Sequence, residues 1–288
     1  MIVGIDSYCF HRYFGEVYPG LETEPADPMN VPDMIDRVAD FGADAVSIES
    51  FMLGPQDTSN TIGRRIRDRE LDVLWAWGHP DGLGSGANPQ ALEDLYYHVD
   101  FASEVGATVM RICAGGRRTR PASWSEHKDA LLPLLVKACA YATDRGITLA
   151  MENHIDFTAA QAVEIVEAVG SSSLGLCLDT GNQLRMLEDP KAAIRSMAPY
   201  AKACHFKDVT AYKGDPTTFG FWPSVATGDG LIDFEDALQA LSENHFEGIL
   251  ALEIDYHHPD NGTLDEAIER SLVKMRSLVE NLADSAVA

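Results

Sequence analysis

Four short stretches of the chain share one design, an apolar strand pattern that ends in a side chain able to bind a metal or carry a proton. In residues 147–154, Leu149 and Met151 share one face and Ala150 and Glu152 share the other, because successive side chains of a strand point to opposite sides. Large apolar residues on one face and small ones on the other are typical of a parallel barrel strand whose outer face meets helices. The stretch therefore predicts a barrel strand with a polar inner end.

The other three stretches repeat this alternation at residues 174–179, 203–208 and 249–255. The four strands together place four polar side chains at one end of the barrel interior, namely Glu152, Asp179, His205 and Glu253. Three carboxylates cannot converge unpaired at such a site, because each loses hydration and repels the others. A divalent cation resolves this conflict. Two Glu, one Asp and one His suit Mn2+, Mg2+ or Co2+ better than a structural Zn2+, and we expect Mn2+, with Mg2+, Co2+ or Zn2+ as alternatives.

Strand and helix patterns alternate eight times along the 288 residues. The remaining strands are predicted at residues 2–7, 45–49, 72–79 and 107–113, and the helices at 31–41, 58–69, 89–105, 125–145, 159–169, 190–197, 234–243 and 264–282. Residues 8–29 and 209–232 are expected to be long loops. The alternation predicts one domain, residues 1–288, folded as a single α/β (β/α)8 TIM barrel, with an open doubly wound sheet as the runner-up. An open sheet would not let Glu152 and Glu253 share a site.

Composition limits the partners of the protein. The net charge of -23 disfavours binding to a phosphate backbone, so we expect no nucleic-acid partner. No apolar run reaches the length of a membrane span, and the first residues carry no signal-peptide pattern. The five cysteines form no CxxC pair and have apolar neighbours, which indicates reduced thiols. We therefore expect a cytoplasmic protein.

Five further residues are candidates for the site. His154 follows Glu152 on the same face and either orients a ligand or acts as a catalytic base. Lys207, beside His205, either stabilises charge on the substrate or pairs with Asp255. His79 and Trp77, near the end of the third strand, are candidates for substrate contact, with core packing as the alternative. Arg111 on the fourth strand is expected to face inward, where it pairs with Glu49 or Glu152 or contacts the substrate.

The chain resembles the xylose-isomerase-like TIM barrel superfamily of sugar-phosphate isomerases and epimerases. The resemblance is carried by the segments MENH (151–154), LDTGN (178–182), CHFKD (204–208), GDGLIDF (228–234) and LEID (252–255). It implies that the four polar strand ends are metal ligands. Relatives of this kind include ketose 3-epimerases, inosose isomerases and dehydratases, and the lyases that cleave C-glycosides. In the epimerases, the residues matching Glu152 and Glu253 exchange protons with opposite faces of the substrate.

Two positions depart from the epimerase pattern. Asn182 stands where these enzymes usually have a histidine, and Ala211 stands where they often have an arginine. Both departures weaken the ketose-epimerase assignment, and the first also removes a histidine that endonuclease IV, another member, requires for its metal cluster. Asn182 is retained as a candidate for substrate contact.

These observations predict a metal-dependent isomerase or epimerase acting on a keto-sugar or related polyol. Glu152, Glu253 or His154 would remove a proton next to a carbonyl, and the metal would hold the enediolate charge. The alternative is a metal-dependent lyase or dehydratase that eliminates a β-substituent from a 3-keto sugar, including C-glycoside cleavage. A non-catalytic sugar-binding barrel is a third interpretation. The resemblance implies a small carbohydrate substrate, no membrane partner, and a homo-oligomer, or a hetero-oligomer with a small subunit.

Overall fold

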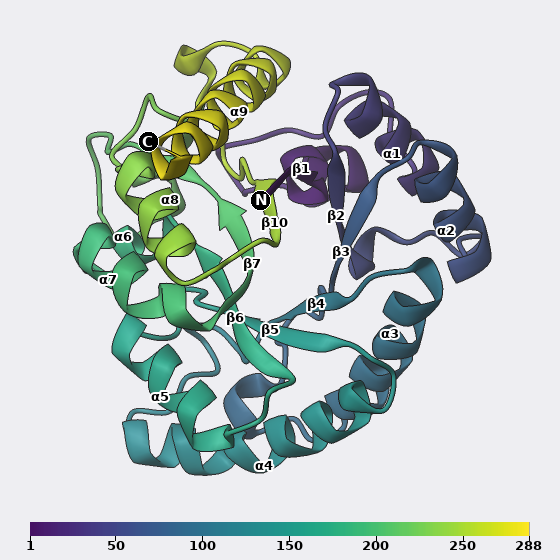
Figure 1. Ribbon diagram of the computed structural model, residues 1–288, viewed down its shortest axis with the longest axis vertical. Helices are drawn as coiled ribbons and strands as arrows, with labels where there is room; N and C mark the ends of the chain where they lie inside the picture. The colour runs from purple at the N-terminus through teal and green to yellow at the C-terminus, as the bar shows by residue number, and fades with distance from the viewer. Residues whose placement is uncertain (288) are drawn as a thin grey trace.

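The eight alternating apolar stretches form eight parallel strands that close into a barrel (Figure 1). The computed structural model describes residues 1–287. The barrel strands are β1 (Ile2–Asp6), β2 (Ala45–Glu49), β3 (Asp72–Ala76), β4 (Val109–Ile112), β5 (Thr148–Glu152), β6 (Leu174–Asp179), β7 (Ala201–Phe206) and β10 (Ile249–Leu252). Strand β10 pairs with β1, placing Leu252 opposite Ile5, and β1 pairs in turn with β2. This closure confirms the predicted barrel and excludes the open sheet.

Helices surround the barrel (Figure 1). They are α1 (Val31–Asp40), α2 (Ser59–Asp68), α3 (Ala91–Val105), α4 (Trp124–Thr143), α5 (Ala159–Val169), α6 (Asn182–Arg185), α7 (Pro190–Met197), α8 (Phe234–Glu243) and α9 (Leu264–Val287). Their limits follow from local sequence, as α5 illustrates. The Thr158 side chain accepts a hydrogen bond from Gln161 N at the start of α5, and Gly170 ends the helix in the left-handed conformation.

The two faces of the strands divide the core as the alternation predicted. Small or slender side chains fill the barrel interior, namely Leu74, Ala150, Cys177, Ala203 and Ala251. The larger residues that flank them along the chain, such as Met151 and Leu250, pack in a separate cluster between the strands and the helices. An eight-stranded barrel has room inside only for layers of packed side chains. The polar side chains therefore lie beyond these layers, at the carboxyl ends of the strands.

The two segments predicted as long loops contain structure that the sequence patterns did not indicate. Residues 7–14 form a 3-10 helix, η1 (Ser7–Phe14), and the second segment contains the two-stranded sheet of β8 (Asp208–Val209) and β9 (Ser224–Val225). Asp208 holds the second segment in place, because its carboxylate accepts hydrogen bonds from the backbone N–H groups of Gly228, Gly230 and Ile232. Such a long-range tether leaves no periodic signal in the sequence.

The structure also bears on two expectations drawn from composition. Within residues 1–287, no helix has both the length and the apolarity that crossing a bilayer requires. The five cysteines are free thiols, and all of them are buried.

Candidate metal centre

The four predicted ligands converge at one point of the barrel. Asp179 and His205 are register partners on neighbouring strands, and His205 is also opposite Ala251, two residues before Glu253. Each of the four residues Glu152, Asp179, His205 and Glu253 offers one ligand atom, and these atoms all lie within 4.8 Å of one another. All four side chains are buried. The structure thus brings the four side chains together, and their role as metal ligands stays a prediction.

Several of these atoms have no hydrogen-bond partner. Asp179 Oδ2, Glu253 Oε2 and both ring nitrogens of His205 are buried and form no hydrogen bond. His205 Nδ1 lies 2.8 Å from Glu253 Oε2, an ion-pair distance when the imidazole is protonated. A bound ion would give these atoms the partners that buried polar atoms usually have, in addition to their ion-pair contacts. An oxygen-rich set with one imidazole fits a divalent metal at this position.

Lys207 extends into the same cluster. Its Nζ lies 3.0 Å from Asp179 Oδ2, 2.9 Å from Glu253 Oε1 and 3.4 Å from Asp255 Oδ2. Burial alone would lower the pKa of Lys207, but Asp179 and Glu253 raise it well above its ordinary value. The predicted pairing with Asp255 is therefore present, and the ammonium also compensates the charge of two candidate ligands.

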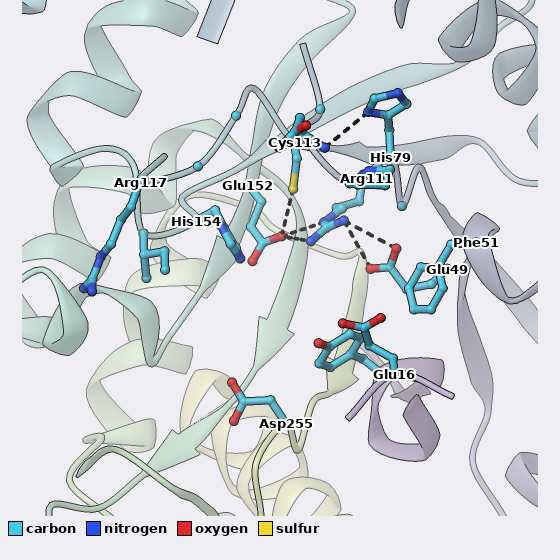
Figure 2. A pocket seen from close by; sticks show the side chains of 18 of the residues that line it. Glu16, Glu49, Phe51, His79, Arg111, Cys113, Arg117, Glu152, His154 and Asp255 are labelled. Carbon is cyan, nitrogen blue, oxygen red and sulfur yellow. Dashed lines mark hydrogen bonds and ion pairs between the residues drawn. The ribbon is translucent and has the colours of Figure 1, made fainter. Parts of the chain in front are cut away.

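Arg111 on β4 joins two carboxylates across the barrel mouth (Figure 2). Its Nε lies 2.5 Å from Glu152 Oε2, its Nη2 contacts the same oxygen, and its Nη1 lies 3.1 Å from Glu49 Oε1. Burial acts to raise the pKa of Glu152, but Arg111, His205 and His154 together outweigh it and lower this pKa to about 2. The sequence indicated a pairing with Glu49 or Glu152, and the structure shows both.

Asn182 lies behind Glu152 and contacts it directly. Asn182 Nδ2 donates to Glu152 Oε1 over 3.0 Å, while its Oδ1 accepts a hydrogen bond from Arg185 Nη1. Arg185 is itself buried and paired with Asp255 over 2.7 Å. Asn182 thus orients a candidate ligand, and it is not among the residues that line the cavity.

Three residues that orient the cluster were not identified as site residues from the sequence. Asn153 exchanges hydrogen bonds with the backbone of Asp179 and so locks the ends of β5 and β6 together. Asp6 Oδ2 lies 3.6 Å from His205 Nε2 and also contacts the Ser47 hydroxyl. Asp6 ends β1 on the inner face, so the alternation could have identified it. The role of Arg185 depends on contacts across the fold, which no local pattern reveals.

A cavity of about 550 Å³ opens above the cluster. Among the candidates, it is lined by Glu152, Glu253, His154, Lys207, His79 and Arg111. Figure 2 shows His154 beside Glu152, with Glu49 on the far side of Arg111. His154 Nδ1 is buried without a hydrogen-bond partner, and burial lowers the pKa of the imidazole.

Trp77 does not lie where substrate contact would require. Its side chain is fully buried in the cluster between strands and helices, and its indole N–H donates to Asp94. Leu74 faces the barrel interior, so Trp77, three residues later, falls on the opposite face. This placement argues against the expected substrate contact and supports the alternative, core packing.

A comparison with known protein families places this geometry in context. The family model described as xylose isomerase-like TIM barrel matches residues 35–276. The chain belongs to this family. Among curated family relatives, it is 23% identical over 245 residues to the 3-oxo-isoapionate decarboxylase of Pectobacterium atrosepticum, covering 85% of this chain and 82% of that protein. It is 26% identical over 227 residues to the inosose dehydratase of Clostridium beijerinckii, covering 69% and 74% of the two chains.

Solved structures show the same fold. The crystal structure of IOLI protein with a bound zinc atom matches 98% of this chain and 99% of that chain with a TM-score of 0.75 at 16% identity. The structure of L-ribulose 3-epimerase matches 99% and 96% of the two chains with a TM-score of 0.74 at 18% identity. At these identities the likeness establishes the barrel architecture and nothing finer.

Proposed function

We propose that this protein is a divalent-metal-dependent lyase that removes a proton next to the carbonyl of a keto-sugar or related polyol and then expels a β-substituent. The observation that carries the proposal is the position of His154, which lines the same cavity as Glu152 and Glu253. An ion held by the four ligands would polarise the carbonyl and acidify the neighbouring C–H bond.

Four side chains have separate roles in the removal of the proton. His154 takes the proton, because it lines the cavity and burial favours its neutral form. Arg111 and Asn182 occupy both carboxylate oxygens of Glu152 and hold its orientation. Lys207 places a positive charge beside the ligands, where negative charge develops on the substrate.

The candidate reactions share the removal of the proton and differ in the step that follows it. Elimination is supported by one of the relatives described above, the inosose dehydratase, because dehydration expels a hydroxyl group as water. Elimination is also supported by Asn182, which stands in place of the histidine usual in epimerases. The Asn182 side chain is hydrogen-bonded to Glu152 and Arg185. The isomerase or epimerase expected from the sequence is the second candidate. It is favoured by one observation, that both Glu152 and Glu253 line the cavity.

The deciding experiment is incubation of the Mn2+-loaded protein in D2O with a panel of keto-sugars and keto-polyols, including inososes, followed by NMR and mass spectrometry. We expect deuterium exchange at the carbon next to the carbonyl, together with an unsaturated or dehydrated product. An epimer or isomer labelled with deuterium would instead support the second candidate. His154→Gln should lose exchange while keeping metal content and the circular dichroism spectrum. Exchange at wild-type rates after chelation, or in this variant, would refute the proposed mechanism.

A further inference from the structure

Glu49 is a buried carboxyl group in the cavity that the metal centre does not use. It ends β2, its residue is 3% exposed, and it lines the same cavity as His154 and Glu253. Its backbone N–H donates to Ser7 Oγ over 2.9 Å, which fixes the end of the strand. Glu49 is absent from the group of four side chains that can share an ion. Burying a carboxyl group costs free energy, so its presence in this cavity calls for an explanation.

Arg111 supplies one positive charge between two buried carboxylates. Glu152 receives two contacts from the guanidinium, the Nε contact at 2.5 Å and a second from Nη2, whereas Glu49 receives Nη1 alone at 3.1 Å. One cation compensates one carboxylate, so the less tightly held group is the one that retains a proton. Burial raises the pKa of Glu49 to about 7 against the opposing effect of Arg111. The other charged groups that act on Glu49 are Asp6 on β1, His205 on β7 and Glu152 on β5.

Glu49 lines the wall of the cavity next to Gly78. Gly78 follows β3, and a Cβ atom at this position would lie 2.6 Å from Glu49 Oε2, so a side chain at residue 78 would collide with the carboxyl group. In Figure 2, Glu49 and His154 lie on opposite sides of the Glu152–Arg111 pair. Both groups line the same cavity, on either side of this pair.

We infer that Glu49 is the proton donor to the leaving oxygen. This inference rests on the proposed function and specifies its second step. His154 takes the proton from the carbon next to the carbonyl, the electron pair of that C–H bond forms the new C=C bond, and the C–O bond at the β-carbon breaks. The proton of the Glu49 carboxyl group passes to the departing oxygen and completes a water molecule. The resulting Glu49 carboxylate and His154 imidazolium return to their starting states by proton exchange with solvent.

The test compares Glu49→Gln with wild type on two substrates. With a hydroxyl leaving group, the variant should lose dehydration by about 10²–10⁴-fold and keep deuterium exchange next to the carbonyl, because exchange needs no acid. With a fluoride leaving group at the same carbon, elimination should return to near the wild-type rate, because fluoride departs without a proton. Glu247→Gln, an exposed glutamate outside the cavity, controls for the loss of one carboxylate.

Three outcomes overturn the inference. The first is dehydration at the wild-type rate in Glu49→Gln. The second is an equal fall in exchange, dehydration and fluoride elimination, which would assign Glu49 a structural role through Arg111. The third is a wild-type protein that neither exchanges nor eliminates, which removes the proposed function and this step with it. Retained exchange in the variant shows that its site is folded, so a loss confined to dehydration separates failure of the acid from failure of the fold.

Discussion

Lys207 Nζ lies 3.0 Å from Asp179 Oδ2, so a buried ammonium shares a carboxylate with the candidate metal position. The same nitrogen contacts Glu253, a second candidate ligand. These contacts compensate negative charge that would otherwise be buried without a partner. The barrel is therefore expected to fold without its metal, and Lys207 sets how much stability the metal-free protein retains.

Replacing Lys207 tests this relationship. Lys207→Met should lower the free energy of unfolding of the metal-free protein by about 3–5 kcal/mol, because it leaves buried carboxylates uncompensated. Addition of Mn2+ should recover part of this loss. Urea unfolding followed by tryptophan fluorescence, with and without metal, measures both effects. Lys191→Met removes a half-exposed lysine paired with Asp236 and should leave the unfolding midpoint close to wild type. Equal losses in the two variants would contradict the role given to Lys207.

Glu253→Gln tests the metal centre directly. The amide keeps the size of the side chain but removes the anionic ligand, so affinity for Mn2+ should fall by more than about tenfold. Isothermal titration calorimetry of the metal-free protein gives the dissociation constants, and elemental analysis gives the metal content as purified. The far-UV spectrum should be unchanged. Wild-type affinity in this variant would remove Glu253 from the ligand set.

Arg111→Met leaves both Glu49 and Glu152 without their shared cation. The loss of one partner from a buried ion pair typically costs about 3–5 kcal/mol, and here the loss acts mainly on Glu152, because Glu49 is the group that retains a proton. We expect a marked fall in the urea midpoint at pH 7 and a smaller fall at pH 5, where protonation removes the uncompensated charge. Arg145→Met is the matched control, because its partner Asp100 remains in contact with solvent. Equal effects at the two pH values would argue against this account.

Asp156 gives a pH-dependent prediction. Neither carboxylate oxygen has a hydrogen-bond partner, and burial raises the pKa of Asp156 to about 7. Because the folded state holds this proton more tightly than the unfolded state, the contribution of Asp156 to stability falls as pH rises from about 4 through 7. Asp156→Asn should therefore gain stability relative to wild type by roughly 2–3 kcal/mol between pH 5 and pH 8. Thermal unfolding across this range checks it, with exposed Asp144→Asn as the control; a pH-independent difference would contradict the assignment.

The alternation of side chains along single strands was sufficient to predict most of the fold. Helices α5, α7 and α8 begin and end where the apolar periodicity predicted. The same alternation placed Ala150 and Cys177 inside the barrel and would also have placed Trp77 outside, had it been followed along β3. Element type and strand face depend on neighbours two to four positions away, so the sequence carries them locally.

The meeting of the four candidate ligands was also determined by the sequence, because each ends a strand on its inner face and parallel strands of a barrel end at one rim. Only the tertiary structure decided how the remaining charges are shared. Arg111 divides one cation between Glu49 and Glu152, and Asn182 holds Glu152 from behind. These contacts join residues far apart in the sequence, and their lengths depend on barrel closure and strand register. The sequence therefore specifies which groups meet at the rim, whereas the closed barrel determines which of them are paired and which remain available for chemistry.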